Sequence, residues 1–318
     1  MRNRLWTPYD TGPDDGNTAK KEIIMRVFVT GATGFVGSAV VRELIEAGHQ
    51  VAGLARTDEA TAALRAAGAE PHPGSLDDLA SLRDAAATAD GVIHLAFVHD
   101  FANFEAANQT DRRAIAALGE ALAGSDRPFV ITSGTGLLPP GRVGTEEDEP
   151  GTHSPRGAAE QVALSFVERG VRVSVLRLPL VHGEGDPGFV ATAIGIAHTK
   201  GVSAYVGDGD HRWSSVHRHD AARLYRLALE KAPAGARLHA VAEEGVPVRD
   251  VAHVIGRRLG VPVTPITAQE ASEHFGWLAS FVTLDMPASS ALTQKLLDWR
   301  PGRPGLIADL NEGHYFKG

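Results

Sequence analysis

Three glycines spaced three residues apart are the clearest chemical signal in the chain. Gly31, Gly34 and Gly37 follow the β-branched run VFV at 27–29 and precede a helical pattern. The first glycine permits a sharp turn after a strand. The second lets backbone approach a pyrophosphate, and the third lets the helix pack closely on the strand. Because N–H groups at a helix start favour phosphate, residues 25–37 predict a dinucleotide-binding turn.

Arg56 stands where such a fold distinguishes NAD from NADP. The segment HQVAGLA at 49–55 is predicted to be the second strand. An acidic residue just after this strand holds the ribose 2′-hydroxyl of NAD, whereas an arginine meets the 2′-phosphate of NADP. Arg56 comes first here, and no carboxylate precedes Asp58. We therefore expect NADP(H); the alternative is a solvated arginine beside bound NAD.

Strands and helices alternate at short spacing through the first half of the chain. Helices are predicted at 35–47, 60–67, 76–87, 104–123 and 158–168, and strands at 49–55, 70–77, 90–97, 128–132 and 171–178. This alternation implies an α/β fold with a Rossmann-type, doubly wound parallel sheet.

The chain divides into three predicted parts. Residues 1–24 are polar and interrupted by proline and glycine, so we expect a disordered extension. Residues 25–181, with returning segments near 206–242, are predicted to form the dinucleotide-binding domain. Strict alternation lapses after this, and residues 182–205 and 243–318 are predicted to form a smaller substrate-binding lobe.

Composition narrows the classes of partner. The chain of 318 residues has a formal net charge of −8, which predicts no basic surface for nucleic acid or anionic membrane. It has no cysteine, which excludes disulfides and thiolate chemistry. No apolar run is long enough to span a membrane, and no secretion signal is visible, so we expect a cytoplasmic protein acting on a small molecule.

The run TGATGFVG at 30–37 resembles the TGxxGxxG signature of the short-chain dehydrogenase/reductase superfamily, in its extended or atypical branch. The resemblance continues over nearly the whole chain from Met25. It implies that the nucleotide lies along the glycine turn, the ends of the third, fourth and fifth strands, and a later V-H-G turn. The residues that it implies are Gly31, Thr33, Gly34, Phe35, Val36, Gly37, Arg56, Ser75, Leu76, Leu95, Ala96, Phe97, Thr132, Pro179, Val181 and His182.

The family's usual proton-transfer residues are missing. Members commonly carry a Tyr-x-x-x-Lys pair after a serine or threonine at the end of strand five. None of the four tyrosines here has a lysine four residues on. Similarity to the family's P-Y-G-x-S-K places Arg156 at the tyrosine position, Glu160 at the lysine position and Gly134 at the serine position. The resemblance therefore implies cofactor binding but not the usual mechanism.

Four residues are candidates for the missing chemistry. His153 has an ordinary pKa near 6.5 and could act as an acid or base. Arg156 could clamp a carboxylate or stabilise a developing oxyanion. Ser133 or Thr135 could hydrogen-bond a carbonyl oxygen. The alternatives are an exposed loop histidine at 153 and an ion pair between Arg156 and Glu160.

Three functions follow from these residues. The first is an NADP(H)-dependent oxidoreductase that reduces a carbonyl or imine through an atypical proton donor. The second is an epimerase, dehydratase or lyase that keeps its nucleotide bound. The third is a protein that senses NADP(H) without catalysis.

Smaller features complete the expectations. The histidines at 211, 217 and 219 lack the spacing of a metal site, so no metal is expected. The acidic residues at 146–149 are interpreted as a solvated loop. The family resemblance implies a possible homodimer through the helices at 104–123 and 158–168.

Overall fold

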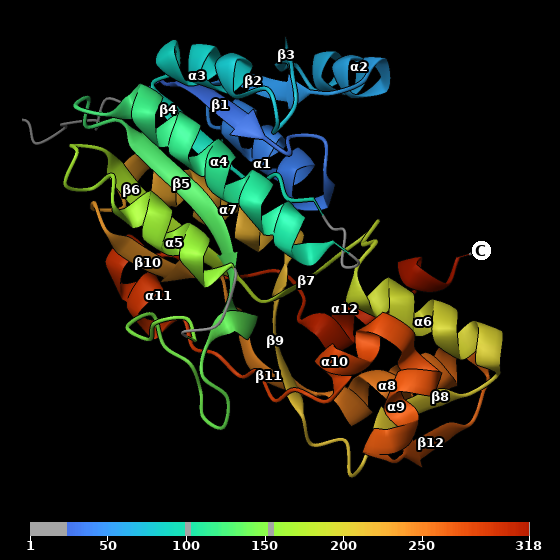
Figure 1. The fold of residues 1–318 in the computed structure, drawn as a ribbon. Helices are drawn as coiled ribbons and strands as arrows, with labels where there is room; N and C mark the ends of the chain where they lie inside the picture. The colour runs from blue at the N-terminus through green and yellow to red at the C-terminus, as the bar shows by residue number, and fades with distance from the viewer. Residues whose placement is uncertain (1–23, 99–102, 152–155, 318) are drawn as a thin grey trace, which may run out of the picture.

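The computed structural model describes residues 24–98, 103–151 and 156–317. Its larger part is built on a seven-stranded sheet in the order β10-β6-β5-β4-β1-β2-β3, and every neighbouring pair is parallel (Figure 1). The predicted doubly wound α/β fold is confirmed. The strands are β1 (Arg26–Thr30), β2 (Gln50–Ala55), β3 (Glu70–Pro73), β4 (Gly91–His94), β5 (Pro128–Gly134), β6 (Arg172–Leu178) and β10 (Ala236–His239).

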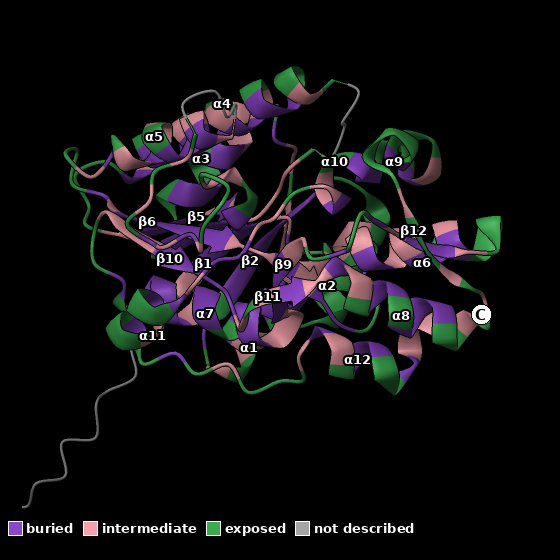
Figure 2. Ribbon diagram, turned by 90° about the horizontal axis from the view of Figure 1, so that it is seen from below, coloured by how far each residue is buried: buried purple, intermediate pink, exposed green. Residues whose placement is uncertain are grey.

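Helices cover both faces of this sheet (Figure 2). On one face α4 (Phe104–Leu122) packs between α3 (Leu79–Ala87) and α5 (Gly157–Leu164). On the other face α1 (Phe35–Glu46) packs against α7 (Arg218–Lys231), and α2 (Asp58–Ala66) adds Leu64 to the same core. Since α1 and α4 lie on opposite faces, β1 and β4 mark the switch point where such folds bind ligands.

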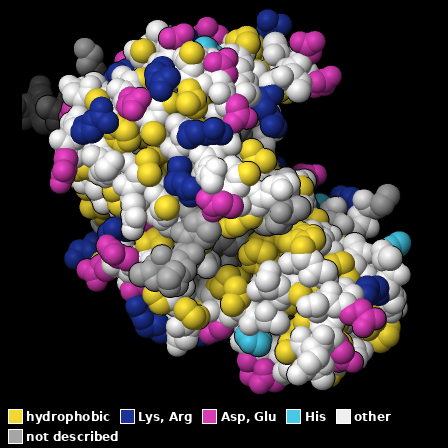
Figure 3. Space-filling view, in the orientation of Figure 1, with side chains coloured by type: hydrophobic (Ala, Val, Ile, Leu, Met, Phe, Trp, Pro, Cys, Tyr) yellow, Lys and Arg dark blue, Asp and Glu magenta, His cyan; other side chains and the backbone are white. Residues whose placement is uncertain are grey.

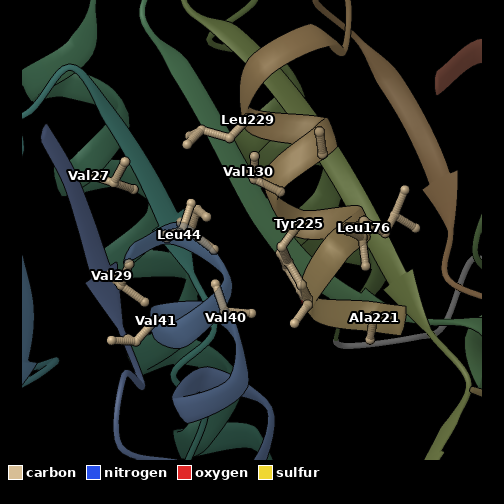
Figure 4. Close-up of a cluster of buried hydrophobic side chains, with 14 of the residues drawn as sticks. Val27, Val29, Val40, Val41, Leu44, Val130, Leu176, Ala221, Tyr225 and Leu229 are labelled. Atoms are coloured by element: carbon tan, nitrogen blue, oxygen red, sulfur yellow. The ribbon is translucent and has the colours of Figure 1, made fainter. Parts of the chain in front are cut away.

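The alternation of side chains along β1 explains why both faces are apolar. Val27 and Val29 face the core shared with α1 and α7, where Leu44 and Tyr225 also pack (Figure 4). Phe28 faces the opposite core, with the helices α3, α4 and α5. Successive side chains of a strand point to opposite sides, so a strand buried on both faces needs an unbroken apolar run.

The later part of the chain forms smaller sheets. One contains β7 (Leu180–His182), β9 (Arg212–His217) and β11 (Glu243–Pro247), and another pairs β8 (Ser203–Val206) with β12 (Val263–Ile266). The helices here are α6 (Phe189–Lys200), α8 (Val248–Leu259), α9 (Ala268–Phe275), α10 (Ala279–Val282) and α12 (Leu306–Glu312), with the 3₁₀ turn η2 (Gly276–Leu278). We call the elements α6, β8, α8, β12, α9, η2, α10 and α12, which share one core, the smaller lobe.

Three elements lie outside these layers. The 3₁₀ turn η1 (Thr135–Leu137) follows β5, α11 (Ala291–Leu297) packs beside β10 and α7, and η3 (His314–Phe316) ends the described chain. Among the described residues, no helix has both the length and the apolar character needed to cross a membrane. The predicted extension at 1–24 falls almost wholly outside the described ranges.

Some of the predicted strands and helices are present in the structure but begin or end at other residues than predicted. The third strand, predicted at 70–77, ends at Pro73, and the following helix begins only at Leu79. Asp78 sets this start, because its Oδ1 accepts a hydrogen bond of 3.1 Å from the Ser81 N–H and so caps the helix. The helix predicted at 158–168 spans Gly157–Leu164 and ends in a turn.

Candidate cofactor and active site

The glycine turn has the close backbone geometry that its spacing predicted. Gly31 has φ +67°, a left-handed conformation that favours glycine, and an added Cβ there would lie 2.8 Å from the Ala96 nitrogen. A Cβ at Gly37 would collide with the Gly31 carbonyl oxygen. Gly34 is the N-cap of α1 and has no side chain, so no cap blocks the helix start.

The turn lies at the switch point between β1 and β4. Thr30 ends β1, and its Oγ1 accepts a hydrogen bond of 3.2 Å from the Ala96 N–H, while its carbonyl accepts one of 3.3 Å from the Leu95 N–H. The backbone after β4 is therefore fixed beside Gly31. A glycine cradle, an open helix start and a switch point together fit a dinucleotide.

The residues predicted near the adenosine end lie along β2 and β3. Arg56 directly follows β2 and is exposed, and it forms no ion pair with any described residue. Thr57 caps α2 by accepting a hydrogen bond of 3.2 Å from the Ala60 N–H. Ser75 is half-buried and accepts a 3.3 Å hydrogen bond from the Asp77 N–H, while Leu76 is buried. Arg56 is thus available for an anion.

Arg156 reaches the end of β5 from the start of α5. Its Nη2 donates a hydrogen bond of 3.3 Å to the Thr132 carbonyl oxygen, and its guanidinium lies 3.9 Å from the centre of the Phe97 ring. Burial lowers the pKa of Arg156, and the charge of Asp111 opposes that shift. Three predicted residues therefore meet at one edge of the sheet: Phe97 after β4, Thr132 in β5 and Arg156 at the N-cap of α5.

Glu160 does not pair with Arg156. Its two carboxylate oxygens accept hydrogen bonds of 2.9 and 2.7 Å from Nε and Nη2 of Arg177 on β6, and both side chains are buried. The expected alternative of an Arg156–Glu160 ion pair is therefore wrong. Sequence reasoning missed the Glu160–Arg177 pair, because the two residues lie on elements whose contact only the fold creates.

Tyr225 was also missed as a neighbour of the site. Its hydroxyl lies 2.8 Å from Thr132 Oγ1, and that hydroxyl group of Thr132 donates a 2.8 Å hydrogen bond to the His94 carbonyl. Burial raises the pKa of Tyr225, so the phenol stays protonated. The Tyr225 side chain, which comes from α7, is fully buried and holds Thr132 by this contact.

The other candidates for proton chemistry differ in their surroundings. Ser133 Oγ is buried and has no hydrogen-bond partner among the described residues. Thr135 is buried, and its Oγ1 lies 3.3 Å from Ser214 Oγ on β9. His153 lies outside the described residues, so its position stays a prediction.

A buried polar chain supports the same edge from α4. Thr30 Oγ1 lies 2.8 Å from His94 Nδ1, and His94 Nε2 lies 3.1 Å from Asp111 Oδ1. The other oxygen of Asp111 is buried without a partner among the described residues. This chain ties the ends of β1 and β4 to α4.

His182 lies in a second histidine cluster. Its Nδ1 is 2.7 Å from Asp309 Oδ2 on α12, and its ring meets His217 edge to face at 5.5 Å. Burial, with a smaller contribution from His182, lowers the pKa of His217 to about 4. Pro179 directly follows β6, and Val181 lies half-buried in β7. His182 is fully buried, and its place along the nucleotide, which the family resemblance implies, stays a prediction.

One group among the described residues has metal-like spacing, and it does not include the histidines at 211, 217 and 219. Asp309, Glu312 and His314 offer ligand atoms within 4.8 Å of one another. Since Asp309 already contacts His182 and Glu312 is exposed, we assign no metal to this group.

Glu146 corrects the interpretation of the acidic run. It is buried, and its Oε1 accepts two hydrogen bonds of 2.7 Å, from N–H and Oγ1 of Thr293 on α11. The prediction of a fully solvated loop at 146–149 was wrong for this residue. Its partner lies 147 residues away, so no local signal could have shown the contact.

The model of the NAD-dependent epimerase/dehydratase family matches residues 27–241. This range contains the glycine turn, the switch point and the edge at Arg156. The chain belongs to the NAD-dependent epimerase/dehydratase family. The predicted resemblance to extended short-chain dehydrogenases is thereby confirmed.

The chain is similar to two relatives in sequence and to one solved structure in fold. An uncharacterized protein of Schizosaccharomyces pombe is 52% identical, over 92% of this chain and 100% of its own length. A ketoreductase of Stigmatella aurantiaca, named for 4-hydroxy-2-methyl-3-oxo-4-farnesyl-3,4-dihydroquinoline-1-oxide, is 26% identical over 79% of this chain and 80% of its own. DesIV of Streptomyces venezuelae, a dTDP-glucose 4,6-dehydratase solved with NAD and TYD bound, has a TM-score of 0.75 at 19% identity, covering 92% of this chain and 97% of its own.

This member of the epimerase/dehydratase family keeps the nucleotide turn and changes the start of α5. Arg156 faces the sheet edge, whereas Glu160 turns to Arg177 and is fully engaged there. A buried carboxylate in a bidentate pair is poorly suited to bind the hydroxyls of a ribose. The two side chains therefore have different surroundings, Arg156 at the sheet edge beside Thr132 and Phe97, and Glu160 in the core with Arg177.

Proposed function

We propose that the protein is an NADP(H)-dependent oxidoreductase that reduces a carbonyl or imine of a small molecule. The observation that carries this proposal is the Arg156 guanidinium, held at the Thr132 carbonyl beside the switch point. It supplies positive charge where carbonyl reduction develops negative charge. The ketoreductase relative supports the same class of reaction.

The chain must do two things at the reacting oxygen. NADPH, when bound, supplies two electrons as a hydride to the carbonyl carbon and becomes NADP⁺. Arg156 then stabilises the negative charge on oxygen, and one proton completes the alcohol. Arginine is too weak an acid to give that proton readily. We assign the proton to His153, three residues before Arg156, because an imidazolium is acidic near neutral pH.

An epimerase or dehydratase cycle is less well supported by these residues. Such reactions also need a group that removes a proton from carbon. Arg156 cannot accept a proton, and the phenol of Tyr225 is buried with a raised pKa. Neither residue provides the required base, which leaves only His153, and we assign that residue to proton donation.

The preference for NADP(H) rests on Arg56. Its guanidinium is exposed at the end of β2 and forms no ion pair with a described residue. A 2′-phosphate placed there would gain a charge-assisted, bidentate contact. The first acidic residue after β2 is Asp58, so no carboxylate directly follows the strand to bind a ribose hydroxyl instead.

The test uses purified protein, NADPH or NADH, and a panel of ketones, aldehydes and imines, and follows the loss of reduced-nucleotide absorbance. We expect NADPH to be consumed with at least one carbonyl or imine, and NADH to be consumed more slowly. Tight binding of NADP⁺ without consumption of NADPH by any compound would contradict the oxidoreductase and favour a sensing role.

A further inference from the structure

One segment of the smaller lobe runs beside the end of β5. The Met286 carbonyl accepts a 3.0 Å hydrogen bond from Ser214 Oγ, and that hydroxyl lies 3.3 Å from Thr135 Oγ1 in η1. A Cβ added to Gly136 would lie 3.2 Å from the Met286 sulfur. The residues just before Met286 are therefore held close to the edge that carries Ser133 and Thr135.

Aromatic rings gather on this side of the smaller lobe. The Phe189 ring lies 4.5 Å from Phe281 and 5.7 Å from Trp277, centre to centre. Trp277 is 45% exposed and Leu284 is 41% exposed. We call Phe189, Trp277, Phe281 and Leu284 the aromatic wall. Figure 3 shows hydrophobic side chains gathered on the smaller lobe where it turns toward the larger one.

Both segments that supply the aromatic wall lack positive charge. Residues 183–189, which lead from β7 into α6, and residues 275–286 contain no lysine, arginine or histidine. They contain three acids instead, Glu184, Asp186 and Asp285. Nearby Arg212 is already held by Asp285, through contacts of 3.0 Å from Nε and 2.8 Å from Nη2.

The apolar side chains and the charges of these segments favour one of two kinds of carbonyl compound. A nucleotide sugar carries a diphosphate, which needs cationic partners when it leaves water. The four residues of the aromatic wall offer none. The neighbouring acids Glu184 and Asp186, which form no ion pair with a described arginine or lysine, would repel the phosphates. An alkyl chain or an aromatic ring would instead bury apolar surface against the exposed faces of Trp277 and Leu284.

We infer that the substrate is an uncharged, apolar ketone or aldehyde, whose alkyl chain or ring lies against the aromatic wall while its carbonyl oxygen faces Arg156. The carbonyl part of this inference rests on the proposed function. The apolar part rests on the wall itself.

Binding to the protein loaded with NADP⁺ tests the inference, because no ketone can be reduced in that state. The probes are 2-butanone, 2-hexanone and 2-octanone, with UDP-glucose as the polar, anionic probe, each titrated by calorimetry. We expect the dissociation constant of the ketones to fall by about three- to fourfold for each added methylene, and UDP-glucose to bind more weakly than 2-octanone. A flat series, or tighter binding of UDP-glucose, would overturn the inference.

Substitutions in the aromatic wall test whether it causes the dependence of ketone binding on chain length. Trp277→Ala and Leu284→Ala should each weaken binding of 2-octanone by about tenfold and leave 2-butanone nearly unchanged. Leu292→Ala is the matched control, since Leu292 is 44% exposed but lies on α11 outside the wall. Equal effects on the short and long ketones would contradict the assignment.

These titrations, together with the NADPH-consumption assay on the same ketones, separate the two proposals. If the ketone series tightens with chain length but NADPH is never consumed, the apolar site stands and the proposed reaction fails. If NADPH is consumed with ketones of every length at equal efficiency, the reaction stands and the apolar site fails.

Discussion

The glycine turn and the start of α5 lie at the same edge of one sheet, yet they relate to their family in opposite ways. At the turn, Gly31 and Gly37 keep backbone contacts that any side chain would disrupt. At α5, Arg156 and Glu160 stand where the resemblance implies tyrosine and lysine, and both make new contacts. The nucleotide turn thus follows the family pattern in this chain, whereas the start of α5 departs from it.

The difference has a physical reason. The turn is constrained by backbone geometry, which a substitution breaks by collision. The start of α5 is constrained by side-chain chemistry, which another set of groups can replace if each buried charge finds a partner. Glu160 finds Arg177, while Arg156 keeps its guanidinium at the sheet edge beside Phe97.

The largest expected effect is at Glu160, which stands at the family's lysine position. It tests whether this residue stabilises the core or binds the cofactor. Glu160→Gln leaves Arg177 buried without its carboxylate and should lower the free energy of unfolding by about 3–5 kcal/mol. Urea denaturation measures this loss. Glu149→Gln is the control, since Glu149 is 76% exposed in its pair with Arg237 and should cost less than about 1 kcal/mol.

The Glu160→Gln variant also tests whether the start of α5 has lost its part in binding the cofactor. If α5 no longer binds the ribose through this position, the folded Glu160→Gln protein should bind NADP⁺ within about twofold of the wild type. A large loss of affinity with unchanged stability would show that Glu160 belongs to the cofactor site.

A side chain at the glycine turn should have the next largest effect. Gly37→Ala places a Cβ against the Gly31 carbonyl oxygen, so the turn and α1 must separate. We expect NADP⁺ affinity to fall by more than about a hundredfold, measured by calorimetry on protein whose circular dichroism shows that it is folded. Wild-type affinity would contradict the close-approach account of the turn.

Arg56→Ala sharpens the cofactor side of the comparison. Loss of one exposed, charge-assisted contact should weaken NADP⁺ by about tenfold, while NAD⁺ affinity changes by less than about twofold. Equal losses for both nucleotides would place Arg56 away from the 2′-phosphate.

The smallest effect concerns pH and lies at His217, beside the histidine at 182. Because burial lowers the pKa of His217 to about 4 from 6.5, the unfolded chain binds the extra proton between these values. Stability is therefore lost as pH falls from 6.5 toward 4. His217→Asn keeps a cap for α7 and should reduce this slope by about 0.5–1 kcal/mol per pH unit, allowing for solvent screening of the half-buried ring.

Urea denaturation at several pH values measures the slope. This slope is a pH dependence of stability. It is separate from the pH dependence of catalysis that His153 would produce. An unchanged slope in His217→Asn would assign the acid sensitivity to other groups, such as His239, whose pKa burial also lowers.

Sequence reasoning succeeded where a signal was local. The strand, turn and helix around Gly31 are specified within thirteen residues, and the structure has each of them. The alternation of strands and helices likewise predicted the parallel sheet, since each unit buries its own apolar face. Arg156 was reached through the family pattern, and the structure places it at Thr132 and Phe97.

The rest depended on contacts between distant segments. Tyr225 reaches Thr132 across 93 residues, and His182 reaches Asp309 across 127. Glu146 was interpreted as part of a solvated acidic run, because no neighbouring residue in the sequence indicates its buried partner, Thr293. Partners of buried polar groups are set by tertiary packing, so periodicity and charge runs do not identify them.

We propose that Arg156 acts on charge at the substrate oxygen, while the glycine turn and Arg56 secure the nucleotide. The most direct test compares wild type with Arg156→Gln, measuring kcat for NADPH-dependent reduction of 2-octanone and the dissociation constant of NADP⁺. We predict that kcat falls by about 100- to 1,000-fold and that NADP⁺ binding stays within about twofold. Unchanged kcat, or loss of NADP⁺ binding in the same variant, would contradict the claim.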